Sequence, residues 1–218
     1  MSVCGDIHGL FNRMQRFSFP FDYGVIPTDG IYVLFERGES AHGVDRIVRI
    51  GTHTGAGKLR SRLMEHFVKE NKERSIFRKN IGRALLQKNG DRFLLEQWNL
   101  DLTKSAEKDK HTGSMDFKRQ TETEKMVSEY IRSNVSFVVF EVPDKADRLR
   151  LESALISTVF QCNECQPSEA WLGRFSPKPK IVQGGMWLVN ELNKTPLTSG
   201  DVDALRALCF GKKNRRRR

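Results

Sequence analysis

Hydrophobic positions in this chain form short continuous runs and four-residue spacings, which are typical of strands and of amphipathic helices respectively. The apolar run that follows Gly30 and a second run at 46–53 are separated by a polar, glycine-containing segment, so we predict a hairpin over residues 31–53. The continuous apolar run at 135–142 predicts a buried central strand. A further short strand is expected at 91–98.

Helices are expected where apolar residues recur every three or four positions. Leu59, Leu63 and Phe67 form one such stripe in a segment that begins at Lys58. Similar patterns predict helices over 75–87, 119–132, 147–160 and 201–209.

Together these elements predict a mixed α/β (α+β) fold, in which helices flank a small central antiparallel sheet. We divide the chain into an N-terminal arm at 1–29, a domain at 30–165 and a C-terminal extension at 166–218. The domain carries an insertion at about 91–133, in which the polar stretch 101–117 is expected to be an exposed loop.

The composition indicates a basic protein with an ordinary hydrophobic content of 38% and a net charge of +10. Six positive charges lie in the tail at 212–218, and clustered cations attract nucleic acids. A tail that only aids solubility and a nuclear-import signal are the alternatives. No apolar run reaches the roughly 20 residues of a membrane span, and the N-terminus lacks the pattern of a secretory signal. We therefore expect an intracellular, cytoplasmic protein with no membrane partner.

Two of the four cysteines, Cys162 and Cys165, have the C-x-x-C spacing that can form half of a zinc site. The sequence offers no second pair and no nearby histidine pair, so ordinary reduced thiols are the favoured interpretation of Cys4, Cys162, Cys165 and Cys209.

Glu152 falls in the middle of the apolar face that Leu149, Leu155, Ile156 and Val159 give to the helix at 147–160. A buried carboxylate without a partner costs several kcal/mol, so Glu152 needs a cation beside it. A divalent metal ion at the edge of a cleft and a structural ion pair with an arginine are the two interpretations.

Four further polar side chains lie within or at the edge of apolar patterns. Arg62 and His66 are four residues apart at the edge of one helical stripe, where they could reach a phosphate and relay a proton. Arg49 lies among apolar residues of the second hairpin strand, and Tyr32 lies in the first. A cation beside a phenol favours the phenolate, although strand tyrosines are usually core residues.

The segment GTHTGAGK at 51–58 superficially resembles a nucleotide-binding phosphate loop. The required spacing would place a glycine at Thr52 and a serine or threonine at Leu59, so the motif fails twice. We expect no nucleotide cofactor.

These residues together resemble the GIY-YIG nuclease superfamily. Gly30-Ile31-Tyr32 matches the first signature triplet, and Arg49-Ile50-Gly51 stands in the place of the second. Arg62, His66 and Glu152 match the family's helical residues in order, and Asn163 matches its downstream asparagine. The segments at 77–86 and 171–181 are similar to those of restriction-type members.

The resemblance implies a DNA endonuclease that uses one Mg²⁺ ion, with Mn²⁺ as the alternative. Glu152 would hold the metal, and Tyr32 would act as the base with the help of Arg49 or His66. Arg62 would stabilise the transition state, and Asn163 would orient the phosphate or Glu152. Candidate contacts to the phosphate backbone of double-stranded DNA are Lys58, Arg60, Arg78 and Lys79, and an ordinary solvated face is the alternative for each of them.

The main departure from the family pattern is Arg49 in the place of the second signature tyrosine. An active, restriction-type enzyme is the favoured interpretation, because the other site residues are present. The alternative is a catalytically inactive nucleic-acid-binding module in a defence or repair assembly. A symmetric double-strand cut would require a homodimer or two successive nicks.

Overall fold

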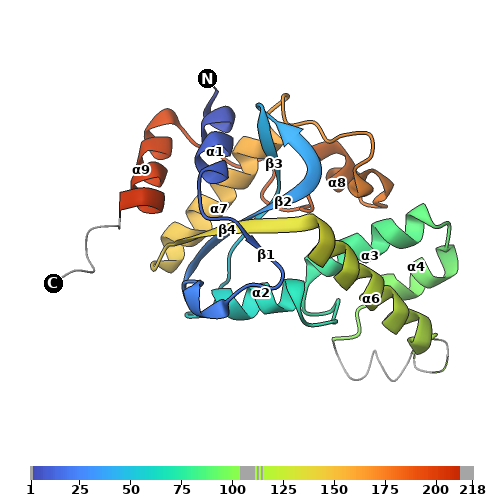
Figure 1. The fold of residues 1–218 in the computed structure, drawn as a ribbon. Helices are drawn as coiled ribbons and strands as arrows, with labels where there is room; N and C mark the ends of the chain where they lie inside the picture. The colour runs from blue at the N-terminus through green and yellow to red at the C-terminus, as the bar shows by residue number, and fades with distance from the viewer. Residues whose placement is uncertain (1, 104–110, 112, 114, 212–218) are drawn as a thin grey trace.

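The computed structural model describes residues 2–103, 111, 113 and 115–211, which form a mixed α/β fold around one antiparallel sheet. Within these residues the sheet has four strands in the order β1-β4-β2-β3 (Figure 1). The strands are β1 (Phe17–Ser18), β2 (Gly30–Ala41), β3 (Val44–Gly51) and β4 (Val135–Glu141). The predicted fold class is confirmed.

The predicted hairpin and central strand are both present in the sheet. β2 pairs with β3 on one side and with β4 on the other, and both pairings are antiparallel. The hairpin turns at His42 and Gly43, whose φ angles are 53° and 76°. Two successive positive φ values are typical of a tight turn that matches the twist of the paired strands.

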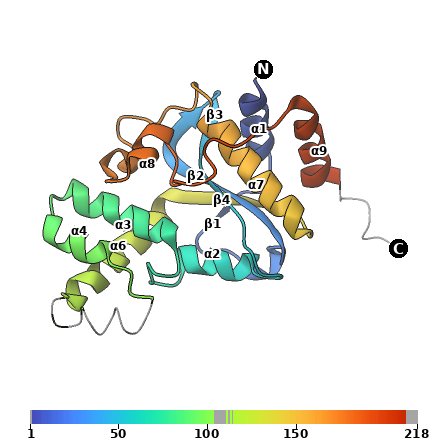
Figure 2. The same ribbon diagram turned by 180° about the vertical axis from the view of Figure 1, so that it is seen from behind.

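One face of the sheet is covered by three helices from the two ends of the chain and from its middle (Figures 1 and 2). They are α1 (Val3–Asn12), α7 (Lys145–Phe160) and α9 (Ser199–Phe210). Their buried residues share a core with the odd-numbered positions of β2, such as Ile31 and Val33.

The helix α1 lies in the arm at residues 1–29, where the sequence pattern predicted no helix or strand. The Ser2 side chain caps the helix by accepting a hydrogen bond from the Gly5 N–H group, and Ile7, Leu10 and Phe11 are fully buried. His8 is also buried on this face, because its Nε2 accepts the Ile47 N–H hydrogen bond. A buried histidine and two glycines interrupt the apolar spacing, so the helix was not evident from the sequence.

The opposite face is covered by α2 (Leu59–Phe67), α3 (Ile76–Lys88) and α6 (Phe117–Asn134), with α4 (Arg92–Asn99) packed against α3 and α6. The strand predicted at 91–98 is wrong, since this segment is α4. Asp91 caps α4 through the Leu94 N–H group, and Leu94, Leu95 and Trp98 form one buried helical face. The short apolar run fits the spacing of a strand as well as that of a helix, and the Asp91 cap favours the helix.

The segment after α7 packs into both cores instead of forming a separate layer. It contains η3 (Leu172–Phe175) and α8 (Pro179–Gly184). The indole N–H groups of Trp171 and Trp187 donate to Glu36 Oε2 on β2, at 3.1 and 2.8 Å. Residues on both sides of the boundaries drawn at 29/30 and 165/166 therefore share the same cores.

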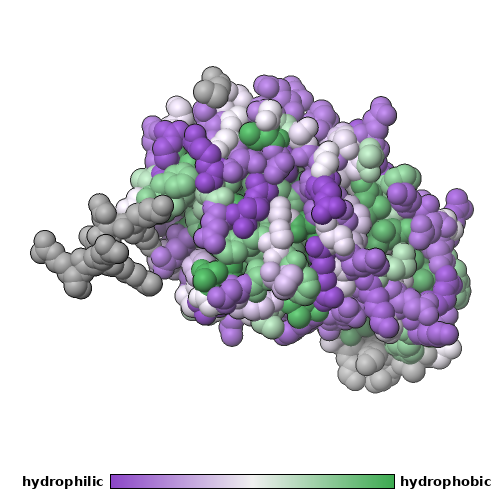
Figure 3. All heavy atoms as spheres, viewed as in Figure 1, coloured by the Kyte–Doolittle hydropathy of each residue, from purple (hydrophilic) through white to green (hydrophobic). Residues whose placement is uncertain are grey.

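The surface seen in Figure 3 has hydrophilic residues that surround and separate smaller hydrophobic patches. Among the residues described, no helix is both long enough and apolar enough to span a membrane. The basic tail at 212–218, and most of the stretch 101–117 expected as a loop, fall outside the described residues.

Candidate active site

Tyr32 and Gly51 lie opposite each other on β2 and β3, and the tyrosine side chain crosses over the glycine. A Cβ atom on Gly51 would lie 2.2 Å from the Tyr32 hydroxyl oxygen. Position 51 therefore has to be glycine if the phenol is to keep this position. Tyr32 itself is 1% exposed, so its hydroxyl needs a partner inside the protein.

That partner is His66 on α2, which continues the hydrogen bonding to a third residue. The Tyr32 hydroxyl lies 2.8 Å from His66 Nε2, and His66 Nδ1 lies 2.7 Å from the hydroxyl of Ser75. Ser75 is also the N-cap of α3, where its side chain accepts the Arg78 N–H hydrogen bond. The phenol is thus anchored through an imidazole to the start of a helix.

His66 is held in its neutral form. Burial lowers its pKa well below the usual value, and the positive charges of Arg62, Arg49 and Arg78 lower it further. A neutral imidazole has one nitrogen that accepts a hydrogen bond and one that donates. His66 Nε2 can therefore accept the Tyr32 hydroxyl proton while Nδ1 donates to Ser75.

Glu152 on α7 approaches the same strand end from the other side of the hairpin. Its Oε1 atom accepts a hydrogen bond of 2.9 Å from the Thr52 N–H group, and Thr52 directly follows Gly51. Burial raises the pKa of Glu152 above its ordinary value, although the Thr52 hydrogen bond and the charge of Arg49 oppose this rise. The peptide between Gly51 and Thr52 therefore has the phenol on one side and the carboxylate on the other.

Arg49 lies on the same face of the hairpin as Tyr32 but pairs with Leu34, so it is not directly opposite the phenol. It donates to the Trp187 carbonyl oxygen at 2.5 Å, and its guanidinium carbon lies 5.4 Å from the centroid of the Phe77 ring. Its buried Nε atom has no hydrogen-bond partner among the described residues. The charge of Arg49 acts on both His66 and Glu152.

A surface hollow of about 440 Å³ opens beside these groups. Thr52, Lys58, Arg62 and Arg74 are among its lining residues. Arg62 donates to Glu65 Oε2 at 3.1 Å and to the Arg74 carbonyl oxygen at 2.9 Å, and a quarter of its side chain is exposed. Three cations around one hollow suit a phosphate-bearing ligand.

Asn163 does not join this group. It is exposed in the loop after α7, and Glu152 lies in the middle of that helix. The eight residues from Glu152 to the last residue of α7 alone span about 12 Å. The structure thus places Asn163 away from the carboxylate that it was expected to orient.

Three of the four cations expected to contact phosphates are engaged within the protein. Arg60 donates to the carbonyl oxygens of Ile26 and Gly24. Arg78 is fully buried in an ion pair of 2.6 Å with Glu124, and the buried Lys79 contacts Glu73 at 3.3 Å. For Arg78 and Lys79 neither a phosphate contact nor a solvated helix face fits the structure, because α4, α6 and η3 all pack around α3. Lys58 remains exposed at the hollow.

Two residues that the sequence did not single out support the site. His53 accepts a hydrogen bond from Gly30 N–H and contacts the Gly55 carbonyl oxygen at 2.6 Å, so it orders the loop that lines the hollow. Glu191 has a φ angle of 61° and accepts a hydrogen bond from Ser153, and its charge opposes ionisation of Glu152. A histidine two residues after the signature glycine was the available signal for His53.

The carboxylate of Glu152 fits a hard divalent cation. Its Oε1 is hydrogen-bonded to Thr52, whereas Oε2 accepts no hydrogen bond from the part of the chain that the structure describes. Carboxylate oxygens are the ligands that Mg²⁺ prefers, and Mg²⁺ commonly keeps several waters when only one or two carboxylates bind it. A nearby cation would also offset the burial that raises the pKa of this group.

Comparison with known proteins identifies one family. A family model described as a GIY-YIG domain matches residues 7–209. No curated protein and no solved structure matches the chain.

Proposed function

This chain belongs to the GIY-YIG family, a family of nucleases, and on that basis we propose that it is a metal-dependent endonuclease that hydrolyses phosphodiester bonds in DNA. The reaction would take place at the mouth of the hollow beside Thr52. The C-terminal segment is part of the matched region and contributes Trp187, which holds Arg49.

The observation that carries this proposal is the meeting of Tyr32 and Glu152 at the peptide between Gly51 and Thr52. The phenol lies against Gly51, and the carboxylate accepts the Thr52 N–H hydrogen bond at 2.9 Å. A proton acceptor and a metal-binding carboxylate are the two groups that hydrolysis by a metal-activated water requires.

Tyr32 would remove the proton from the attacking water. Its own hydroxyl proton would pass at the same time to His66 Nε2, 2.8 Å away. Burial and the neighbouring arginines lower the pKa of His66, so the imidazole is unprotonated before this step and would release the proton again soon after it. Ser75 would hold the imidazole in the required orientation through its contact with Nδ1. The relay gives the phenol proton a place to go while the proton of the water is taken up.

Arg62 would bind the scissile phosphate and stabilise the charge that develops on it. It lies at the hollow with part of its side chain exposed, and its charge acts on both His66 and Glu152. Arg49 would act through the electrostatic field, because Trp187 and Phe77 hold its guanidinium in a buried position.

Glu152 would hold one Mg²⁺ ion, with Mn²⁺ as the alternative, through its Oε2 atom. When bound, the ion supplies positive charge to the scissile phosphate and the leaving oxygen. The protein's own contribution is to orient the carboxylate through the Thr52 N–H hydrogen bond, which also opposes the effect of burial on its pKa.

Double-stranded DNA is the substrate that the charges favour. Lys58 is exposed at the hollow, the side chain of Arg74 is 68% exposed, and the chain has a net charge of +10. Exposed lysines and arginines at fixed positions bind phosphates and orient the duplex. Because one chain carries one such site, cleavage of both strands would need a dimer or two successive nicks.

We further propose that the enzyme is sequence-specific and of the restriction type. The two segments that resemble restriction-type members, at 77–86 and 171–181, correspond to α3 and to η3 with the start of α8. These elements lie in contact with each other. A rigid unit beside the hollow would support base contacts in a groove of the DNA.

The proposal is tested by incubating the purified protein with supercoiled plasmid and Mg²⁺, alongside an EDTA control. Glu152→Gln should abolish cleavage and retain DNA binding, because the shape of the side chain is kept and its charge is lost. Glu129→Gln makes the same change on the exposed face of α6 and should leave cleavage intact.

The products distinguish the outcomes. Discrete fragments would support a sequence-specific endonuclease, whereas nicks or a smear would indicate the same chemistry with little specificity. Absence of cleavage across many DNAs and metals, with retained binding, would support the inactive binding module, in which Arg49 marks a lost active site. Cleavage by Glu152→Gln at the wild-type rate would contradict the mechanism.

A further inference from the structure

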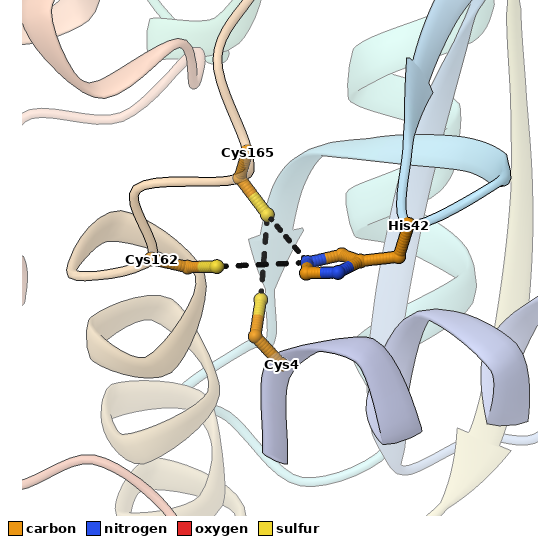
Figure 4. A group of neighbouring side chains, drawn as sticks. All are labelled: Cys4, His42, Cys162 and Cys165. Carbon is orange, nitrogen blue, oxygen red and sulfur yellow. Dashed lines mark hydrogen bonds between the residues drawn. The ribbon is translucent and has the colours of Figure 1, made fainter. Parts of the chain in front are cut away.

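Four potential metal ligands from distant parts of the chain converge at the end of α7, far from the candidate active site. They are Cys4, His42, Cys162 and Cys165, whose ligand atoms all lie within 4.8 Å of one another (Figure 4). Cys4 belongs to α1, His42 to the turn between β2 and β3, and the other two to the loop after α7. We propose that these residues bind one structural Zn²⁺ ion.

The distances between the ligand atoms match a compact tetrahedral site. Bonds of about 2.3 Å to sulfur and about 2.0–2.1 Å to nitrogen place the sulfurs of a tetrahedron about 3.8 Å apart, and sulfur and nitrogen about 3.5 Å apart. His42 Nε2 lies 3.5 Å from Cys162 Sγ and 3.3 Å from Cys165 Sγ. The sulfurs of Cys4 and Cys165 are 3.3 Å apart, so small adjustments would complete the geometry.

The ligand types select zinc and a structural role. Three thiolates with one imidazole form one of the usual sets for structural Zn²⁺, and four protein ligands leave no open position for a reacting water. Hard cations such as Mg²⁺ prefer oxygen ligands, so this site and the Glu152 carboxylate would not compete for the same ion.

The surroundings orient the ligands as they do in known zinc sites. Glu164 Oε2 lies 3.3 Å from His42 Nδ1, which leaves Nε2 free to face the sulfurs. A carboxylate on the second nitrogen of a metal-binding histidine fixes its tautomer and strengthens its bond to the metal.

His8 lies close to the cluster but is not a fifth ligand. Its Nε2 accepts the Ile47 N–H hydrogen bond at 3.2 Å, which places the proton of the neutral ring on Nδ1. Nδ1 then donates to the Cys4 carbonyl oxygen at 2.9 Å. Both nitrogens are therefore engaged, and His8 positions the turn of α1 that carries Cys4.

The site would join three elements that are distant from one another in the sequence. It would hold α1 and the hairpin tip against the C-terminal end of α7, the helix that also carries Glu152. Loss of the ion should therefore loosen the helical layer on this face of the sheet without removing any catalytic group.

The first experiment measures the zinc content of the purified, reduced protein by elemental mass spectrometry. We expect about one zinc per chain, as for a closed structural site. Replacement by Co²⁺ should give the visible absorption of a tetrahedral ion together with charge-transfer bands from thiolates. A folded, reduced protein that contains no zinc and takes up neither metal would overturn the proposal, as would a disulfide between any two of the three cysteines.

The first variant removes a metal ligand at a position where the replacement residue can keep the backbone turn. His42 has a positive φ angle and precedes Gly43, and asparagine is favoured at such a position. His42→Asn therefore keeps the turn and removes the ligand. This variant and Cys165→Ser should each lose most of the zinc, whereas Cys209→Ser, on α9 and outside the cluster, should retain it.

A second readout separates this site from the catalytic metal. Removal of zinc by a chelator should lower the melting temperature of the wild-type protein by on the order of 10 °C, since a ligand that binds only the folded state stabilises it. The Glu152→Gln variant should keep its zinc, and removal of that zinc should lower its melting temperature by the same amount. Full zinc retention in both His42→Asn and Cys165→Ser would overturn the assignment, whatever the cleavage assay shows.

Discussion

At the scale of single residues, Glu152 is held in a position that disfavours its ionised form. Burial raises its pKa in the folded state, so the folded protein holds this proton more tightly than the unfolded chain does. The free energy of unfolding therefore decreases as the pH rises from the ordinary pKa of a glutamate through the raised pKa of Glu152. Glu152→Gln should therefore raise the melting temperature in EDTA at neutral pH by roughly 2–4 °C. Thermal unfolding of both proteins would measure this, with Glu129→Gln as the control. A lower melting temperature would mean that the ionised carboxylate stabilises the apo protein.

Removal of the Tyr32 hydroxyl isolates the proposed base. Tyr32→Phe keeps the ring over Gly51 and removes the group that contacts His66, so the rate of cleavage should fall by about 10²–10⁴-fold. Single-turnover cleavage at saturating protein would measure the loss, and DNA binding should be unchanged. A variant that cleaves at a near wild-type rate would assign proton removal to another group.

His66 gives the stability of the protein a specific pH dependence. Its pKa is lowered in the folded state, so below the ordinary value of 6.5 the unfolded chain binds a proton that the folded chain does not. The contribution is present in full above that value and is lost as the pH falls. Between about pH 7.5 and 5.5, the wild type should lose more stability than His66→Gln in parallel denaturant titrations. Equal losses would show that His66 titrates normally.

At the scale of elements, α3 and α6 are joined by the buried ion pair of Arg78 and Glu124. Arg78 also donates to the His66 carbonyl oxygen at 3.2 Å, so the pair connects these helices to α2. Arg78→Met should cost about 3–5 kcal/mol of stability, because it leaves a buried carboxylate uncompensated.

The same substitution at an exposed arginine should affect DNA binding and leave the stability of the protein nearly unchanged. Arg74→Met, at the hollow, should change stability by less than about 0.5 kcal/mol and weaken DNA binding. Chemical denaturation and a binding titration on both variants check the contrast. Similar stabilities would contradict a structural role for the buried pair.

The elements that the sequence predicts well are those whose signal is local. The apolar runs of β2, β3 and β4 and the spacing of Leu59, Leu63 and Phe67 depend only on neighbours in the chain. Glu152 and His66 also stand out locally, as polar residues within apolar patterns, and the structure places both beside Arg49. Arg78 is predicted as a phosphate contact but is buried, because a local pattern does not reveal that other helices cover α3 on several sides.

Long-range contacts are the part that the sequence does not reveal. Cys4 and Cys165 are separated by 161 positions, and their sulfurs become neighbours only after the sheet brings α1 and the end of α7 together. The same holds for the Glu36 carboxylate, whose two indole partners lie beyond position 170. The spacing of apolar residues within one segment does not indicate which distant residues that segment will contact.

At the scale of the whole molecule, the charge of the chain is unevenly distributed in sequence. Residues 212–218 contain six of the positive charges. Deletion of these seven residues should reduce the salt dependence of DNA binding, by at most about five in the slope of log K against log salt. Cleavage at low salt and saturating protein should be unaffected. Binding measured across a salt series gives the slope, and an unchanged slope would show that the tail makes no phosphate contacts.

The pairing of α1 with α9 has a consequence for how the protein is made. The two helices are in contact, yet nearly the whole chain separates them (Figure 1). At roughly 5–20 residues per second, a ribosome needs about 10–40 seconds to pass from one to the other. During that interval Ile7, Leu10 and Phe11 have no completed core to enter. Nascent α1 is therefore a natural binding site for chaperones, and faster elongation should reduce aggregation during synthesis.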